Sequence, residues 1–377
     1  MPHDTFDVIV VGAGGMGSAT AFELARRGRS VLALEQFPFV HDRGSSHGHT
    51  RIIRRAYYEH PHYVPLVQRA FERWYDLEQR SGRHLLTECP CLNIGPADGE
   101  VVLGVLTSAK QHGLSIESLS ATELASRFPQ FQFDDRFVGV LERDAGFLFV
   151  EDCVRAQLEQ AQLLGATLKA DEPVTEWRSN GQTVTVTTTK GTYEAASLVL
   201  TAGPWSGKLL AEHGVYLRVM RQVMLWFGVE GSADFRRDRF PIFLADLSEG
   251  PVYGLPAIDS RGIKVARHYG APELSSPEEI DRKILPSDEV PVRTFLKRHI
   301  PIANGQLRYA QTCIYTLSPD RHFVIDRHPT YSNVAFATGF SGHGFKFASV
   351  VGEILADLAL SEPASMSIQL FRSARFC

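Results

Sequence analysis

The spacing of apolar and polar positions predicts a strand, helix, strand unit at the start of the chain. The apolar run FDVIVV, residues 6–11, ends at a glycine and has the composition of a strand buried on both faces. Residues 16–28 then repeat apolar positions at helical spacing and stop at Gly28. A second apolar strand, residues 30–35, ends at Glu35. This order predicts an α/β domain.

Further along the chain, helical and strand-like patterns alternate. Residues 61–82 predict an amphipathic helix, and residues 183–202 predict a hairpin around a Lys-Gly turn that continues into an apolar strand. Residues 220–256 predict further strands, and residues 277–300 a helix. Residues 333–360 repeat the strand, glycine loop, helix order of the N-terminus. Because 377 residues exceed the usual size of one hydrophobic core, we expect two domains that are interleaved in sequence.

Composition and charge exclude several classes of function. A net charge of −4 and a pI near 6.4 give no basic surface for nucleic acid. There is no run of 18 apolar residues, so no transmembrane helix is expected. We expect no secretion signal at the N-terminus. The C-terminal residues, which end in Cys377, do not match a peroxisomal targeting signal of the Ser-Lys-Leu type. The cysteines are odd in number and scattered, which predicts free thiols in the cytoplasm and no metal site; they are Cys89, Cys91, Cys153, Cys313 and Cys377.

The loop after the first strand carries the G-x-G-x-x-G pattern. Gly12 permits the tight turn, Gly14 lets the backbone approach a pyrophosphate, and Gly17 lets helix and strand pack closely. Glu35 ends the second strand, where it can accept hydrogen bonds from a ribose hydroxyl. We therefore predict a dinucleotide held by Glu35 and by Gly12, Gly14, Gly15, Met16 and Gly17.

Two features favour FAD over NAD as this dinucleotide. The fingerprint begins within the first ten residues, as is typical of flavoproteins whose ADP half binds at the N-terminus. Residues 198–210, LVLTAGPWSGKLL, place Gly203 after a strand, like the second glycine stretch of two-domain FAD enzymes. An ordinary strand-to-helix turn is the alternative interpretation of Gly203.

Four segments together resemble the monomeric sarcosine oxidase / N-methyltryptophan oxidase family: FDVIVVGAGGMGSATAFELARRG, GSSHGHTRIIRRAYYEHPHYVPL, QTCIYTLSPDRHFVID and GFSGHGFKFASVVGEILADLAL. The likeness keeps its order from about residue 6 to the final FRSARF. It implies a flavoprotein oxidase with a Rossmann-like FAD-binding domain and a smaller substrate domain on a mostly antiparallel sheet. We assign residues 1–80, 145–215 and 310–377 to the FAD-binding domain and residues 81–144 and 216–309 to the substrate domain.

The resemblance also implies that FAD is attached covalently to Cys313 by an 8α-thioether. A thiolate has to attack the methyl group of the oxidised flavin, and nearby cations would lower the pKa of the thiol. For an isolated cysteine, a small buried hydrophobic residue would be the commoner interpretation. Further cofactor contacts are expected at Ser45, Thr50, Val174, Gly203, Gly344 and Phe345.

The substrate class requires an anchor for a carboxylate, and Arg54 and Lys346 match the family's pair. Arginine can bind a planar carboxylate with two hydrogen bonds, and lysine adds a point charge. A solvated basic face is the alternative for Arg54, which lies close to Arg51 and Arg55 in sequence. The cavity wall is expected to consist of apolar and aromatic groups suited to an amine, with contributions from Tyr253, His268, Tyr315 and Gly342.

Lys264 matches the lysine that resembles an oxygen activator in relatives, since a buried cation near the flavin stabilises superoxide. Strand geometry places Lys264, Ala266 and His268 on one face, so Lys264 and His268 are both expected to point into the cavity. A surface lysine on an edge strand is the alternative. The catalytic set is completed by Tyr315 and by two residues of the loop against the flavin, His47 and Arg51.

That loop departs from the family pattern His-His-Gly-Asp-Thr-Arg: Ser46 replaces the first histidine, and His49 replaces the aspartate. The expected reaction is oxidative demethylation of an N-methyl amino acid, most simply sarcosine, by a monomer that uses O2 and forms hydrogen peroxide. N-Methyltryptophan or a cyclic imino acid such as pipecolate or proline remain alternative substrates. A dehydrogenase with another electron acceptor and a non-catalytic flavin protein are alternative classes.

Overall fold

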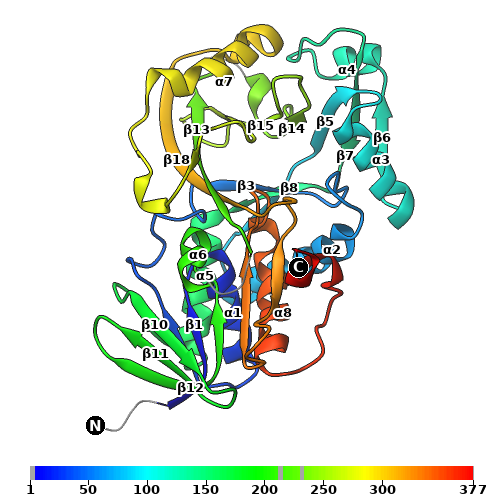
Figure 1. Ribbon diagram of the computed structural model, residues 1–377. Coiled ribbons are helices and arrows are strands. Elements are labelled where there is room, and N and C mark those ends of the chain that lie inside the picture. The colour runs from blue at the N-terminus through cyan, green and yellow to red at the C-terminus, as the bar shows by residue number, and fades with distance from the viewer. Residues whose placement is uncertain (1–4, 211–214, 230–232, 377) are drawn as a thin grey trace.

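The computed structural model describes residues 5–210, 215–229 and 233–376; Cys377 lies outside this range. Figure 1 shows two domains, each with its own large sheet, and a small sheet between them. The two-domain α/β fold expected from the sequence is confirmed. Among the described residues, no helix is long and apolar enough to cross a membrane.

The lower domain in Figure 1 contains an eight-stranded sheet in the order β10-β11-β12-β1-β2-β9, with β20 paired to β12 and β19 to β20. Its centre is parallel, from β9 through β2, β1 and β12 to β20. The last four residues of β1 are all buried, because helices and strands cover both faces. The strands are β1 (Thr5–Val11), β2 (Val31–Leu34), β9 (Thr167–Lys169), β10 (Val174–Ser179), β11 (Val184–Thr188), β12 (Thr192–Leu200), β19 (Val324–Arg327) and β20 (Val334–Thr338).

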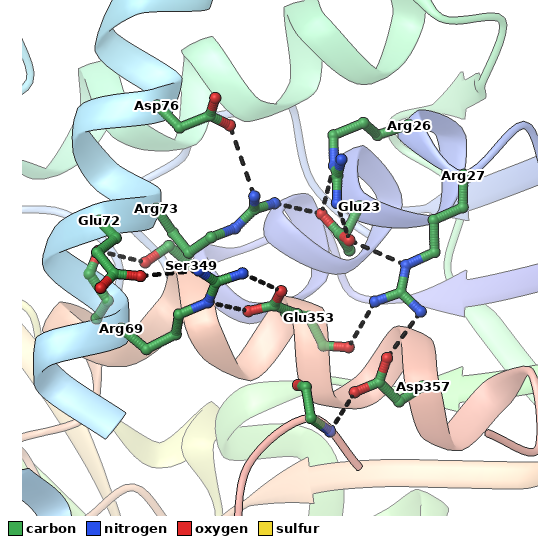
Figure 2. Close-up of polar contacts among 12 residues, drawn as sticks. Glu23, Arg26, Arg27, Arg69, Glu72, Arg73, Asp76, Ser349, Glu353 and Asp357 are labelled. Atoms are coloured by element: carbon green, nitrogen blue, oxygen red, sulfur yellow. Dashed lines mark hydrogen bonds and ion pairs between the residues drawn. The ribbon is translucent and has the colours of Figure 1, made fainter. Parts of the chain in front are cut away.

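Helices of this domain pack against one another beside the sheet. Helix α8 is buried along its whole length, and a Cβ at Gly352 would lie 2.6 Å from the Ala19 backbone of α1. Figure 2 shows the ion pairs that join α1, α2 and α8: Glu23 of α1 pairs with Arg73 of α2, and Arg69 of α2 pairs with Glu353 of α8. The helices are α1 (Gly15–Arg26), α2 (Tyr63–Ser81), α5 (Val150–Leu163), α6 (Ser206–Leu209) and α8 (Ala348–Ala359).

The upper domain contains a nine-stranded sheet in the order β17-β13-β16-β15-β14-β5-β7-β6, with β18 paired to β13. Only β5 and β14 run parallel, so the predicted mostly antiparallel sheet is confirmed. The strands are β5 (Cys91–Pro96), β6 (Ile116–Leu119), β7 (Phe137–Glu142), β13 (Arg218–Phe227), β14 (Ile242–Ala245), β15 (Val252–Leu255), β16 (Ile263–Arg267), β17 (Glu273–Leu274) and β18 (Leu307–Leu317).

Packed aromatic rings form part of the core of the upper domain. Phe243 stacks on Phe295 of α7 and meets Phe131 and Phe240 at their edges. All four rings are buried, so they contribute apolar burial as well as ring contacts. The helices of this domain are α3 (Glu100–His112), α4 (Ala121–Arg127) and α7 (Pro286–His299).

The small sheet joins the domains and consists of β3 (Thr50–Ile53), β8 (Gly146–Phe149) and β4 (Leu86–Glu88). One expected element is shorter than predicted. Residues 277–300 were expected to form a helix throughout, but only a 3₁₀ turn at Pro277–Glu279 and helix α7 form. Leu285 is extended because the ring of Pro286 disfavours a helical conformation in the residue before it, so α7 starts at Pro286.

Candidate active site

One cavity runs from the glycine turn after β1 to the sheet of the upper domain. It collects residues that are far apart in sequence. The predicted residues that line it are Gly12, Gly14, Gly15, Met16, Glu35, Ser45, Arg51, Arg54, Val174, Gly203, Tyr253, His268, Cys313, Tyr315, Gly342, Gly344, Phe345 and Lys346. The other four predicted residues do not line it: Gly17, His47, Thr50 and Lys264.

The glycine turn has the geometry of a dinucleotide cradle. Gly12 has a φ of +87°, and a Cβ there would lie 2.6 Å from the carbonyl oxygen of Thr201. A Cβ at Gly17 would lie 1.7 Å from the carbonyl oxygen of Gly12, so helix α1 can approach β1 only with glycine at this position. Gly15 N–H donates to Ser46 Oγ at 2.9 Å. Ser46, a departure from the family pattern, therefore fixes this turn.

Glu35 lies directly after β2 and underneath the turn. Its Oε2 accepts a hydrogen bond from Ala13 N–H at 2.8 Å, and its Oε1 accepts one from Phe37 N–H at 3.1 Å. The carboxylate still borders the cavity. The two hydrogen bonds hold the turn, and the carboxylate stays at the cavity, where the sequence predicts that it receives ribose hydroxyls.

Cys313 is buried in the middle of β18 and lines the cavity. Arg51 Nη2 lies 3.5 Å from its Sγ. Burial alone would raise the pKa of this thiol, but His47 and Arg51 outweigh that effect and lower the pKa to about 6. At neutral pH the sulfur is therefore largely a thiolate, which is the nucleophilic form.

The loop that supplies His47 and Arg51 is held by a residue that the sequence analysis missed. Glu151, at the start of α5, accepts hydrogen bonds from the backbone N–H of Gly48 at 2.7 Å and of His49 at 3.0 Å. His47 Nε2 donates to the carbonyl of Gly44 at 3.1 Å. No local sequence signal links Glu151 to this loop, because the pairing depends on β3 and β8 lying side by side.

Lys264 corrects one expectation. Its side chain is buried, but Nζ donates to the carbonyl oxygens of Gly48 at 2.8 Å and Thr50 at 2.9 Å instead of lining the cavity. Only His268 of the predicted pair points into the cavity. The ammonium lies against these two carbonyls because a buried cation is stabilised only when oxygen atoms accept its hydrogen bonds. Burial, reinforced by Arg51, lowers the pKa of Lys264 well below its usual value.

Arg54 and Lys346 lie together at the far end of the cavity, as predicted. Arg54 Nη2 donates to Glu59 Oε2 at 2.8 Å, and Lys346 Nζ donates to the carbonyl of His343 at 2.8 Å. Burial and the neighbouring Arg54 lower the pKa of Lys346 to about 7. Glu59, which the sequence analysis missed, balances one of the two positive charges; its signal was an acid five residues after Arg54 in the same loop.

Aromatic groups close the remaining wall. His268 Nδ1 lies 3.1 Å from the Tyr315 hydroxyl, and burial lowers the pKa of His268 to about 3, so this imidazole is neutral. Tyr253 and His268 meet edge to face. Gly342 has a φ of +82°, and a Cβ there would lie 2.3 Å from the Tyr315 ring. Glycine is therefore required where this loop touches the wall.

The fold and the cavity together define an oxidoreductase class: a dinucleotide-binding α/β domain, joined to an antiparallel domain that completes a buried, cationic and aromatic site. The chain belongs to the family of FAD-dependent oxidoreductases, whose model matches residues 7–358. FAD is accordingly the dinucleotide, and the resemblance drawn from the sequence is confirmed.

Individual relatives cover almost the whole chain. It is 43% identical to monomeric sarcosine oxidase from Streptomyces avermitilis over 98% of each chain. It is 36% identical to N-methyl-L-tryptophan oxidase from Salmonella typhimurium, over 98% of this chain and 99% of that one. Among solved structures, NikD, an amino acid oxidase essential for nikkomycin biosynthesis, superposes with a TM-score of 0.86 at 26% identity, covering 98% and 97% of the two chains.

Proposed function

We propose that this chain is a flavoprotein oxidase that demethylates an N-methyl amino acid, with sarcosine as the principal substrate. The observation that carries the proposal is the buried pair Arg54 and Lys346, which faces a neutral wall of His268 and Tyr315 in the same cavity. An amino acid carboxylate suits the two cations, and the neutral wall admits an uncharged secondary amine. The names of the relatives point to the same substrate class.

The residues of the chain act on the substrate mainly by positioning it. Arg54 and Lys346 bind the carboxylate, and Glu59 keeps the net charge of the anchor low enough for one carboxylate. Tyr253, His268 and Tyr315 hold the amine end in surroundings that exclude water. Bound FAD would supply an acceptor for a hydride, two electrons and a proton, from the N-methyl carbon, and O2 would take up the two electrons with two protons as hydrogen peroxide. Release of the imine and its hydrolysis then give formaldehyde and glycine.

We also propose that FAD is attached through Cys313. The low pKa of this thiol and its place in the cavity wall support the tether. We propose that Lys264 stabilises negative charge on reduced oxygen in the cavity. The loop of Gly48–Thr50 would lie between the lysine and the oxygen. The support for this role is a buried amine held by two carbonyls of that loop.

We further propose that the chain works as a monomer in the cytoplasm, with the domain boundaries stated above. The free thiols of the four described cysteines support a reducing compartment. The boundary at residue 310 is the exception: because β18 pairs with β13 of the upper sheet on both sides of it, we move this boundary to the end of β18 at Leu317. Light scattering of the purified protein tests the oligomeric state.

Peroxide formation under air tests the proposed reaction. The panel is sarcosine, N-methyltryptophan, proline and pipecolate, and sarcosine is expected to give the highest kcat/KM. Preference for another member would shift the substrate assignment. Flavin reduction without peroxide would indicate a dehydrogenase, and no flavin reduction by any secondary amine would refute the proposal.

A pair of adjacent arginines supplies the matched control for the anchor. Arg54→Gln is expected to raise the KM for sarcosine roughly 50-fold, because a charged hydrogen bond is lost from a buried site. Arg55→Gln is expected to leave KM unchanged, since the Arg55 guanidinium lies over Phe71 and does not border the cavity. Equal effects of the two substitutions would contradict the assigned anchor.

A further inference from the structure

Three strained residues meet beside the substrate end of the cavity. Tyr269, Arg321 and Ser341 are not glycine, yet their φ values are +75°, +63° and +50°. They lie in three separate loops: after β16, between β18 and β19, and after β20. Left-handed backbone in a bulky residue is costly and persists only when neighbouring contacts hold it.

The three residues hold one another. The Tyr269 hydroxyl donates to the carbonyl of Ser341 at 2.8 Å. The Arg321 guanidinium lies 4.5 Å from the centre of the Tyr269 ring. His343 Nε2 donates to the carbonyl of Arg321 at 3.1 Å, and so ties the group to the loop of Ser341 and Gly342. Tyr269 therefore ties the loop after β16 to the loop after β20, in addition to the backbone hydrogen bond from Ser341 N–H to Thr316 of β18.

Exposure places Tyr269 between solvent and the cavity wall. Arg321 is exposed, Tyr269 is half-buried, and His268 is buried. The Tyr269 ring lies 3.9 Å from the His268 ring and 6.0 Å from the Tyr315 ring, measured between centres. His268 and Tyr315 line the cavity, whereas Tyr269 does not. Tyr269 thus covers the outer side of the wall without reaching the substrate space.

The backbone on either side allows this cover to move. Gly270 follows Tyr269 with a φ of +84°, and Gly342 follows Ser341 with a φ of +82°. Glycine at these positions lets both loops change conformation with little steric cost. The Tyr269 side chain contributes one hydrogen bond and one exposed cation–π contact, whereas the loop of Ser341 is also held by the hydrogen bond from Ser341 N–H to the carbonyl of Thr316 at 2.9 Å. Release of the two Tyr269 contacts would free the loop after β16 and leave the loop of Ser341 with one hydrogen bond fewer.

We propose that Tyr269 is a latch: its hydrogen bond to Ser341 keeps the substrate cavity closed, and its release is the step that admits and discharges the amino acid. The identity of the ligand rests on the proposed function, but the latch itself does not. Because Tyr269 stays outside the cavity, it controls rates of passage and leaves the affinity of the bound ligand unchanged.

Tyr269→Phe tests the latch in the FAD-loaded protein. The probe is methoxyacetate, which replaces the amine of sarcosine with an ether oxygen and keeps the carboxylate. Stopped-flow absorbance of the flavin measures its association and dissociation. Both rate constants are expected to rise roughly fivefold, as loss of one hydrogen bond implies, while Kd stays within about twofold. Tyr75→Phe is the matched control, since Tyr75 donates its hydroxyl to Glu88 on the surface.

Each outcome decides the question. An association rate constant that stays at the wild-type value in Tyr269→Phe would contradict the latch. A changed Kd with an unchanged association rate constant would also contradict it, because Tyr269 would then be a ligand contact. Hydrogen–deuterium exchange gives a second measurement that needs no ligand: amides of residues 339–344 should exchange faster in Tyr269→Phe than in the wild type. If methoxyacetate fails to bind even the wild type, the carboxylate anchor is refuted, and exchange alone decides the latch.

Discussion

The most consequential single residue of the anchor is Lys346, because its charge changes near neutral pH. Burial and the neighbouring Arg54 lower the pKa of Lys346, and Glu59 offsets these effects only in part. Lys346 is therefore protonated below about pH 7 in the free protein and increasingly neutral above it. A carboxylate ligand in the proposed anchor would meet two cations in the first case and one in the second.

Binding of methoxyacetate should follow this titration. Its affinity is expected to be highest below pH 7 and to fall as pH rises through about 7, by at most tenfold per pH unit. In Lys346→Met the affinity should be lower and should lack this step. Isothermal titration calorimetry between pH 5.5 and 9 makes the measurement. A step that persists in Lys346→Met would assign the titration to another group.

Lys264 gives a second test at this scale. Lys264→Met removes the buried amine beneath Gly48 and Thr50. Reoxidation of the reduced flavin by O2 is expected to slow roughly 100-fold, since one electrostatic donor is lost, whereas anaerobic reduction by sarcosine should change far less. The exposed Lys297→Met serves as control. Reoxidation at the wild-type rate would remove Lys264 from the oxygen reaction.

At the level of elements, the ion pairs of Figure 2 fix three helices against one another. Glu23 of α1 is almost fully buried and pairs with Arg26, Arg27 and Arg73. Burial raises the pKa of Glu23, but the arginines together outweigh it and lower the pKa below the usual value. The carboxylate stabilises the fold in its charged form.

Glu23→Gln is expected to destabilise the protein by roughly 3 kcal/mol, because it removes the buried carboxylate that three arginines share. Arg27 and Arg73 keep Asp357 and Asp76 as their remaining partners. Glu72→Gln, which breaks an exposed pair with Arg69, should cost less than about 0.5 kcal/mol. Urea unfolding measures both. Because the folded-state pKa of Glu23 is lowered, its contribution is complete above pH 4.5 and is lost as pH falls further. A Glu23→Gln effect that stays constant into acid would contradict the ion-pair account.

Elements with strong local signals were predictable, and those set by long-range pairing were not. Strands β1 and β2 and helix α1 follow from apolar periodicity and from Gly12, Gly14 and Gly17. The residues that place Glu151 beside the flavin loop belong to strands β3 and β8, nearly 100 residues apart. Likewise, sequence spacing puts Lys264 and His268 on one face but cannot show that a loop from another domain covers only Lys264.

The two domains meet at the cavity. There, Cys313 of β18 in the upper sheet contacts Arg51, which follows His47 in a loop of the lower domain. A covalent FAD would therefore bind both domains as one permanent part of the protein. In Cys313→Ser, FAD can dissociate, and binding of a free ligand stabilises a fold in proportion to the logarithm of its concentration.

Thermal unfolding separates these two cases. The Tm of Cys313→Ser should rise with added FAD, by an amount that corresponds to about 1.4 kcal/mol per tenfold increase in concentration. The Tm of the wild type should not depend on added FAD, and its colour should stay with the chain after denaturation. Colour lost from denatured wild type would refute the tether.

The reactivity of Cys313 exists only in the assembled protein. Its thiol owes its low pKa to His47 and Arg51, which are more than 260 residues away in sequence and reach it only when both domains have closed. In an unfolded chain the same thiol has the pKa of an ordinary cysteine and is a slow nucleophile at neutral pH. Cofactor attachment would thus act as a checkpoint on biosynthesis: a chain that retains yellow colour after denaturation has once folded correctly, and colourless chains report the fraction that never matured.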